Sequence, residues 1–271
     1  MNVAELREKI LDFAQRDTNI RAVIETGAFA RQHPSSDELS DLDIELYARQ
    51  PDLLRQSNTW FEDFGHIWVF LALENDGYNP TRLVIYAGGA KVDFALYDAV
   101  RLEQKLPSQP QQRGFKIHLD KDGLLHDWQV PALTFGVKPE LEVWKQCRAD
   151  FWFEAYNFAK YLARGDLWHA KTRDAEVKEY LLQMLEWHGS ATRGLDTRYM
   201  GRFMENWLDE KSWLEVENIW AGFDVADNFR GLEAKMDLFA RISREVAAIW
   251  GLPMDGVDEA GIHQFVVSHA D

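Results

Sequence analysis

The sequence predicts an α+β protein, with a mixed β-sheet and flanking helices followed by an all-helical C-terminal half. Three observations support this fold class. The first half alternates helical periodicity with short β-branched runs. A segment rich in Pro, Gln and Gly then covers about residues 107–139. Long helical patterns fill the chain from Leu141 onward. With 271 residues and 46% hydrophobic content, the chain can form two ordinary domains. We expect these to be 1–136 and 137–271, with the segment 107–139 as their connection.

The first half begins with a predicted amphipathic helix, because Leu6, Ile10 and Phe13 recur at helical spacing. Strands are predicted where β-branched or alternating apolar residues form short runs between turn residues. The expected order is a helix over 3–16, a strand over 20–26, a Gly-, Pro- and Ser-rich loop over 27–40, an acidic strand over 40–46, a helix over 51–64 that opens on Pro51, strands over 66–74, 81–88 and 91–98, and a possible edge strand within 115–123. A hairpin-type turn at 88–90 separates the last two full strands.

The second half shows helical periodicity throughout. The predicted helices cover about 141–164, 172–189, 198–208, 212–222, 227–250 and 257–267. Nine of the eleven Trp residues lie in this half, if the connecting segment is counted with it. Aromatic residues at helical spacing more often form core than ligand contacts, so we interpret these tryptophans chiefly as core.

Charge and cysteine content narrow the class of partner. The formal net charge is −15, from 45 acidic and 30 basic residues, which argues against a nucleic-acid partner and suits cationic small molecules. The one cysteine, Cys147, excludes an intramolecular disulfide and fits a reducing compartment. The first residues lack the plan of a signal peptide, and no apolar run is long enough to span a membrane. We therefore expect a cytoplasmic protein without a membrane partner.

The stretch "SDLDIEL" places carboxylates on alternate residues. Asp41, Asp43 and Glu45 alternate with Leu and Ile, so on a strand they share one face. Like charges this close raise one another's pKa unless a cation lies between them or the face is open to water. A solvated strand face or a salt bridge is the preferred interpretation for Glu45.

A further carboxylate lies on a later predicted strand, where Asp93 stands between Val92 and Phe94. Together with Asp41 and Asp43 it could converge on one site. Three carboxylates from neighbouring strands suit two hard divalent cations that hold the attacking and leaving oxygens of a phosphoryl transfer. Mg²⁺ would be the natural ion, because it takes few protein carboxylates and completes its shell with water and phosphate.

The order Gly27, Asp41-Leu42-Asp43 and then Asp93 resembles the nucleotidyltransferase superfamily of DNA polymerase beta type. More narrowly, the chain is similar to the aminoglycoside 6-adenylyltransferase (streptomycin adenylyltransferase) family. The similarity covers nearly the whole chain, in the segments "KVDFALYD", "FKIHLDKDG", "DFWFEAYNFAKYLARGDLWHAK" and "EYLLQMLEWHG". An Asp-x-Asp pair alone would be a weak signal, whereas this ordered agreement is specific.

The resemblance implies an enzyme that transfers AMP from ATP to a hydroxyl of a small cationic acceptor such as an aminoglycoside, releases pyrophosphate and serves antibiotic resistance. It implies a nucleotidyltransferase catalytic domain over 1–136 and a helical substrate-binding domain over 137–271. The implied Mg²⁺ ligands and catalytic residues are Asp41, Asp43 and Asp93, with Asp93 either bridging metal or taking the hydroxyl proton. The implied nucleotide-binding residues are Gly27, Ala28, Arg31, Lys160 and Lys171. Each of the two lysines is as readily interpreted as a solvated helix residue. Acids such as Glu25, Glu45 and Asp98 would attract the acceptor.

The chain departs from the family pattern after the first glycine. The family has Ser and Arg there, where this sequence has Ala28 and Phe29. The Ala28 amide could still bind phosphate, and Arg31 could supply a charge. Two alternatives remain open from the sequence. The chain could be a ligand-binding protein that has lost efficient transfer, or a transferase with another small-molecule acceptor. The oligomeric state is open as well.

Overall fold

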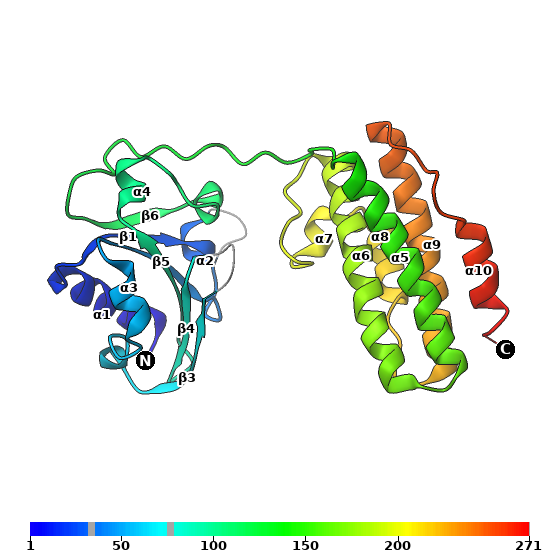
Figure 1. Cartoon of the computed structure of the whole chain (residues 1–271), viewed down its shortest axis with the longest axis horizontal. Helices are drawn as coiled ribbons and strands as arrows, with labels where there is room; N and C mark the ends of the chain where they lie inside the picture. Colours follow the sequence, from blue (N-terminus) through cyan, green and yellow to red (C-terminus); the bar gives the residue numbers. More distant parts are fainter. Residues whose placement is uncertain (32–35, 75–78, 271) are drawn as a thin grey trace. The chain divides into compact units, whose positions relative to one another are not determined.

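The computed structural model describes residues 1–31, 36–74 and 79–270. The chain divides into two compact units, Met1–Leu133 and Thr134–Asp271, which are described separately (Figure 1). The first contains all the described strands, and the second is built from helices.

The first unit is a mixed six-stranded sheet with flanking helices, as predicted. The strands are β1 (Ile20–Thr26), β2 (Leu42–Ala48), β3 (Ile67–Leu73), β4 (Thr81–Tyr86), β5 (Lys91–Asp98) and β6 (Lys116–Asp120), in the spatial order β3-β4-β5-β2-β1-β6. The β2–β5 pair is parallel and the other pairs are antiparallel. The predicted edge strand is confirmed, because β6 lies at one edge of the sheet. The described helical segments of this unit are α1 (Val3–Arg16), α2 (Gly27–Ala30), α3 (Pro51–Gln56), α4 (Val100–Glu103) and the short 3-10 segments Glu62–Phe64 and Pro110–Arg113.

One face of the sheet is covered by α1. Leu6, Ile10 and Ala14 lie on the buried side of this helix and join a core that includes Ile44 and Leu46 of β2. The helix begins at a complete capping box, in which the Asn2 side chain accepts from the Glu5 amide and the Glu5 carboxylate accepts from the Asn2 amide. This apolar face fixes the register of β2, since a slip by one residue would bury its acidic face instead.

The opposite face of β2 carries Asp43, Glu45 and Tyr47. Its apolar end is buried, with the Tyr47 and Tyr97 rings stacked at 5.0 Å between centroids and Trp128 in the same cluster. The other end of this face carries the aspartates. The sheet therefore changes from core to polar surface along β2.

Three sequence predictions for this unit need correction. The predicted loop 27–40 begins with the helical turn α2, and its residues 32–35 lie outside the described residues. The predicted helix 51–64 ends at Gln56, where the Ser57 hydroxyl bonds the side chain and amide of Thr59 and so competes with the helical pattern. Most of the predicted connection 107–139 packs into the first unit.

A hydrogen-bond network explains why that connecting segment folds back. Ser108 and Gln111 are both buried and donate to the Glu45 carboxylate, and the Trp128 indole donates to Gln111 at 2.8 Å. The buried Glu45 carboxylate needs hydrogen-bond donors, and the segment 107–139 supplies them although its composition is typical of a linker.

The second unit is all-helical, as predicted. Its described helices are α5 (Leu141–Ala163), α6 (Leu167–Arg193), α7 (Met204–Trp207), α8 (Glu210–Asn218), α9 (Val225–Trp250) and α10 (Glu259–Val267). The long helices α5, α6 and α9 lie side by side (Figure 1), and the Phe151 and Phe239 rings stack at 3.7 Å in their core. The interpretation of the tryptophans as core residues is confirmed in part, since Trp144 and Trp152 are buried whereas Trp168 and Trp220 are exposed. No helix in the described part of the chain has the length and apolarity needed to cross a membrane.

The predicted helix over 198–208 is shortened to one turn. Met200 and Phe203 have φ of 55° and 58°, a left-handed conformation that interrupts a right-handed helix. Within the predicted range, helix begins only at Met204 and ends at Trp207.

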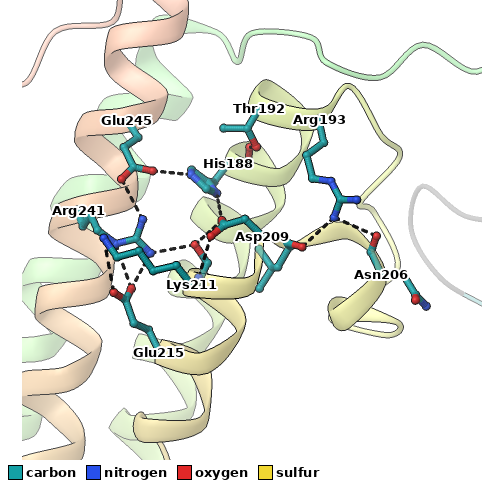
Figure 2. A network of polar contacts seen from close by, with 11 residues as sticks. His188, Thr192, Arg193, Asn206, Asp209, Lys211, Glu215, Arg241 and Glu245 are labelled. Carbon is teal, nitrogen blue, oxygen red and sulfur yellow. Dashed lines mark hydrogen bonds and ion pairs between the residues drawn. The ribbon is translucent and has the colours of Figure 1, made fainter.

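A polar network joins α6, α8 and α9 (Figure 2). Arg241 of α9 donates to Glu215 at 2.5 Å, to Glu245 at 2.9 Å and to the buried Ser212 hydroxyl at 2.9 Å. His188 of α6 lies 2.7 Å from the same Glu245. One guanidinium therefore compensates two carboxylates on separate helices.

Replacing Arg241 with Met is expected to destabilise the second unit by about 2 kcal/mol, because charge-assisted hydrogen bonds to three groups are lost together. The measurement is amide hydrogen exchange of α8 and α9 peptides by mass spectrometry. Arg244→Met is the matched control, since Arg244 lies on the same helix, is 62% exposed and has a single ion pair with Glu259. Equal exchange in the two variants would contradict a stabilising role for the network.

Candidate active site

The structure brings the three predicted aspartates to one end of one sheet face. Asp43 of β2 lies directly opposite Asp93 in the parallel β2–β5 register, so both side chains leave the same face. Asp41 immediately precedes β2. The Asp41 and Asp93 side chains are 43% and 27% exposed, so the cluster is open to small ligands.

A cation, Lys91, lies among these carboxylates. Its Nζ donates to Asp41 Oδ2 at 2.6 Å and to Asp93 Oδ2 at 3.0 Å. Lys91 was not among the predicted site residues. The signal was present in the alternation Lys91-Val92-Asp93, which places Lys91 and Asp93 on the same face of β5.

Gly27 allows Asp43 to occupy its position. This glycine starts α2 directly after β1 and has a φ of +66°, a conformation that L side chains rarely adopt. A Cβ atom at this position would lie 1.8 Å from Asp43 Oδ2. The backbone at Gly27 therefore makes the close approach to the site carboxylate that only glycine permits.

Of the residues that follow Gly27, Phe29 packs into the core and Arg31 lies near the aspartates. Phe29 packs against the apolar face of the sheet, with the Arg7 guanidinium 5.0 Å from its ring centroid. Arg31 follows α2 as its C-cap residue and has a favourable electrostatic interaction with the Asp43 carboxylate. The position where the family has Arg is thus used for packing, while Arg31 supplies positive charge to the site.

The electrostatics of the cluster favour a cation. Burial, followed by repulsion from Asp93 and Asp41, raises the pKa of Asp43 to about 6, against the weaker opposing effects of Lys91 and Arg31. Burial also raises the pKa of Asp93, whose buried Oδ1 lies 2.9 Å from Lys91 Nζ. The raised pKa values of Asp43 and Asp93 show that the nearby positive charge offsets burial and repulsion only in part.

Neutralising Asp43 is therefore expected to stabilise the first unit. The ordinary pKa of 3.8 is the unfolded value, so the folded state binds more protons between about pH 4 and 6 and loses stability as the pH rises through that window. Asp43→Asn removes this cost, and we expect a gain on the order of 1–2 kcal/mol at pH 7 that vanishes near pH 4. Hydrogen exchange of β1 and β2 peptides at the two pH values measures it. Faster exchange in the variant at pH 7 would show instead that the Asp43 charge stabilises the unit.

Other acids do not belong to this cluster, and two expectations for them were wrong. Glu45 is 2% exposed and accepts from Tyr47 at 3.1 Å as well as from Ser108 and Gln111, so it is neither solvated nor a salt-bridge partner. Glu25 lies opposite Ile44 on the α1 face, buried and 2.6 Å from Arg7.

Asp98 also lies away from the aspartate cluster. It occupies the other end of β5, about 17 Å along the strand from Asp93 at the usual rise per residue, and accepts from the Val100 amide. The acids near the cluster are instead those of an adjacent cleft.

That cleft of about 540 Å³ opens beside Asp41, between the chain's N-terminal residues and the β4–β5 turn. Its lining includes the carboxylates of Glu5, Glu38 and Asp41 together with Gly88 and Gly89. A cleft of this size holds a small molecule, and its negative lining favours a cationic one.

The predicted lysines lie in the second unit. Lys171 of α6 is engaged there, with its Nζ 3.0 Å from both Ala221 O and Asn228 Oδ1. Lys160 of α5 has its Nζ 5.4 Å and 5.6 Å from the ring centroids of Tyr156 and Tyr161. Both therefore have contacts that account for their positions within this unit.

A grouping of Ser212, His188 and Asp209 in the second unit superficially resembles a hydrolase triad. The Ser212 hydroxyl is buried and donates to Asp209 at 2.6 Å. His188 Nδ1 lies 3.7 Å from the same Asp209 carboxylate (Figure 2). The geometry places the carboxylate, not the imidazole, next to the hydroxyl. Because a nucleophile needs the base beside it, this group is structural.

The chain is similar to known proteins over nearly its whole length. The sequence profile of the streptomycin adenylyltransferase family matches residues 1–269. The chain is 25% identical over 256 residues to an aminoglycoside 6-adenylyltransferase of Bacillus subtilis, covering 90% of this chain and 89% of that protein. It is 23% identical over 256 residues to the enzyme of the same name from Campylobacter jejuni, covering 90% and 87%. A crystal structure of a B. subtilis aminoglycoside 6-adenyltransferase aligns with a TM-score of 0.47 at 20% identity, covering 98% of this chain and 97% of that one. The chain therefore belongs to the streptomycin adenylyltransferase family and is an enzyme of the adenylyltransferase class.

Proposed function

We propose that this protein transfers AMP from ATP to a hydroxyl of an aminoglycoside or similar small cationic acceptor and releases pyrophosphate. The observation that carries the proposal is the side-by-side register of Asp43 and Asp93, with Asp41 next to them, in a member of this family. In the reaction the acceptor oxygen bonds to the α-phosphorus, the bond from that phosphorus to the β-phosphate oxygen breaks, and pyrophosphate leaves. The hydroxyl proton passes to a carboxylate, for which Asp93 is the candidate.

The donor chemistry of the aspartates fits a magnesium ion. Within the described residues, no three His, Cys, Asp or Glu side chains are grouped closely enough to hold a metal in the arrangement seen, where Lys91 contacts two of the carboxylates. The carboxylate oxygens of Asp41, Asp43 and Asp93 are nevertheless the hard ligands that Mg²⁺ prefers, and burial and mutual repulsion of Asp43 favour an added positive charge there. Bound there, Mg²⁺ would polarise phosphate oxygens and favour the ionised acceptor hydroxyl.

The chain's own residues supply the remaining functions. Gly27, Ala28 and Arg31 are the proposed nucleotide contacts of the first unit, through backbone amides and one guanidinium. Lys160 and Lys171 are the proposed contacts of the helical unit. The helical unit is proposed to bind substrate, and the first unit, together with the acidic cleft beside Asp41, to carry the chemistry. The free cysteine Cys147 favours a reducing compartment, so we propose a cytoplasmic enzyme. A role in antibiotic resistance is proposed from the aminoglycoside acceptor alone.

The test is pyrophosphate release from ATP, GTP and CTP with Mg²⁺, against a panel of aminoglycosides and aminocyclitols. We expect release only with ATP and an accepted aminoglycoside, and loss of release on chelation of the metal. Release that is unchanged by chelation would contradict the metal-dependent reaction.

A second candidate is a ligand-binding protein with little transfer. Ala28 and Phe29 favour it, because Ala28 offers no hydroxyl and Phe29 is used for packing. Titration calorimetry with Mg-ATP and with aminoglycosides separates the candidates. Binding of both ligands without product would support this second function, and binding with turnover would exclude it.

A further inference from the structure

We propose that Lys91 is a resident cation of the site that competes with the divalent ion for the oxygens of Asp41 and Asp93. The inference rests on the proposed function, because it assigns a residue that controls metal entry to the same carboxylates.

Lys91 contacts two of the three carboxylates at once. Its Nζ is 2.6 Å from Asp41 Oδ2 and 2.9 Å from Asp93 Oδ1, so it occupies the space between the two carboxylates. A metal ion that used both carboxylates would enter the space that the ammonium occupies, because Nζ contacts Asp41 Oδ2 and both oxygens of Asp93. One of the two partners must therefore leave when the other binds.

The positive charge of Lys91 offsets repulsion among the carboxylates. Three carboxylates meet here, and Lys91 touches two of them while Arg31 acts on Asp43. Without Lys91, Asp41 and Asp93 would repel one another across a partly buried site. The lysine thus keeps the carboxylates assembled before the metal arrives, and it weakens metal affinity by the energy of its own ion pairs.

The Lys91 side chain can leave the carboxylates without disturbing the sheet. The Lys91 side chain is 28% exposed, so its ammonium can move into water on a flexible four-carbon stem without breaking the sheet, in which only the backbone of Lys91 participates. Displacement is therefore compatible with the fold of the unit.

The primary test is Mn²⁺ binding to the intact chain, measured by electron paramagnetic resonance of the free ion. We expect Lys91→Met to bind Mn²⁺ about tenfold or more tightly than the wild type, in line with the effect of one close opposite charge. Lys105→Met is the control for net charge, since Lys105 is 63% exposed and pairs with Asp127 in the same unit. Adding Asp43→Asn to Lys91→Met should abolish the gain, which places the bound ion at the aspartates.

A second test uses the wild type and needs no variant to fold. Metal binding should free the Lys91 ammonium, so Mn²⁺ should increase acetylation of Lys91 by an amine-reactive reagent, read by peptide mass spectrometry, and leave Lys105 unchanged. Equal Mn²⁺ affinity in wild type and Lys91→Met, in a protein that releases pyrophosphate, would overturn this inference alone. Absence of Mn²⁺ binding and of pyrophosphate release in both would overturn the inference and the proposed function together.

Discussion

Asp43→Asn is expected to reduce adenylyl transfer by about a thousandfold or more while the fold is retained. The substitution removes one charge from the cluster of Asp41, Asp43 and Asp93 and changes little volume. A loss of this size corresponds to about 4 kcal/mol of transition-state stabilisation, which is typical for a group that acts directly on developing charge. The measurement is kcat for pyrophosphate release at saturating ATP and acceptor.

Asp63→Asn is the control for this variant. Asp63 is exposed in the same unit and outside the cluster, and the substitution makes the same change in charge. We expect its activity to match the wild type. Turnover within a few-fold of wild type in Asp43→Asn would exclude a catalytic role for the aspartate cluster. Loss of activity combined with the gain in stability expected at pH 7 would show that Asp43 is kept for function at the expense of stability.

Gly27→Ala is expected to have the second largest effect. The added Cβ would lie 1.8 Å from Asp43 Oδ2, so the carboxylate must leave its position beside Asp93 in the cluster. The substitution also imposes a φ of +66° on a residue with a side chain, which costs about 1–2 kcal/mol. We expect a loss of activity approaching that of Asp43→Asn, because the misplaced group is the same.

Gly123→Ala separates the two causes. Gly123 has a φ of +67°, and a Cβ there would meet nothing within 4 Å. We expect Gly123→Ala to lose stability in thermal unfolding through the same backbone strain as Gly27→Ala, and to keep the turnover of the wild type. If Gly27→Ala and Gly123→Ala had equal activity, the close approach to Asp43 would have no functional role.

The sheet and its acidic face were predictable because their signals are local. Alternation in "SDLDIEL" placed Asp41 and Asp43 on one face of a strand, and the resemblance to the nucleotidyltransferase pattern predicted that Asp93 joins them, as the β2–β5 register shows for Asp43 and Asp93. The turn at Gly88–Ala90 likewise predicted the β4–β5 hairpin. The alternation Lys91-Val92-Asp93 also places Lys91 on the same face as Asp93, so Lys91 was predictable as a site residue.

The errors arose where long-range contacts decide the structure. Nothing in the local pattern shows that Glu45 is buried, because its partners Ser108 and Gln111 lie more than sixty residues away in sequence. The same contacts draw a linker-like segment into the first unit. The break before α7 depends on left-handed backbone at Met200 and Phe203, residue types that do not signal it.

The most direct test of the central claim is mass spectrometry of the acceptor after incubation with ATP, Mg²⁺ and the intact protein. The account predicts an aminoglycoside product heavier by one adenylyl group, formed by the wild type and by Asp63→Asn and lost in Asp43→Asn. An unmodified acceptor across the aminoglycoside and aminocyclitol panel, with protein that binds ATP and is folded, would contradict it. Product formed equally well by Asp43→Asn would also contradict it, because the chemistry would then not depend on the aspartate cluster.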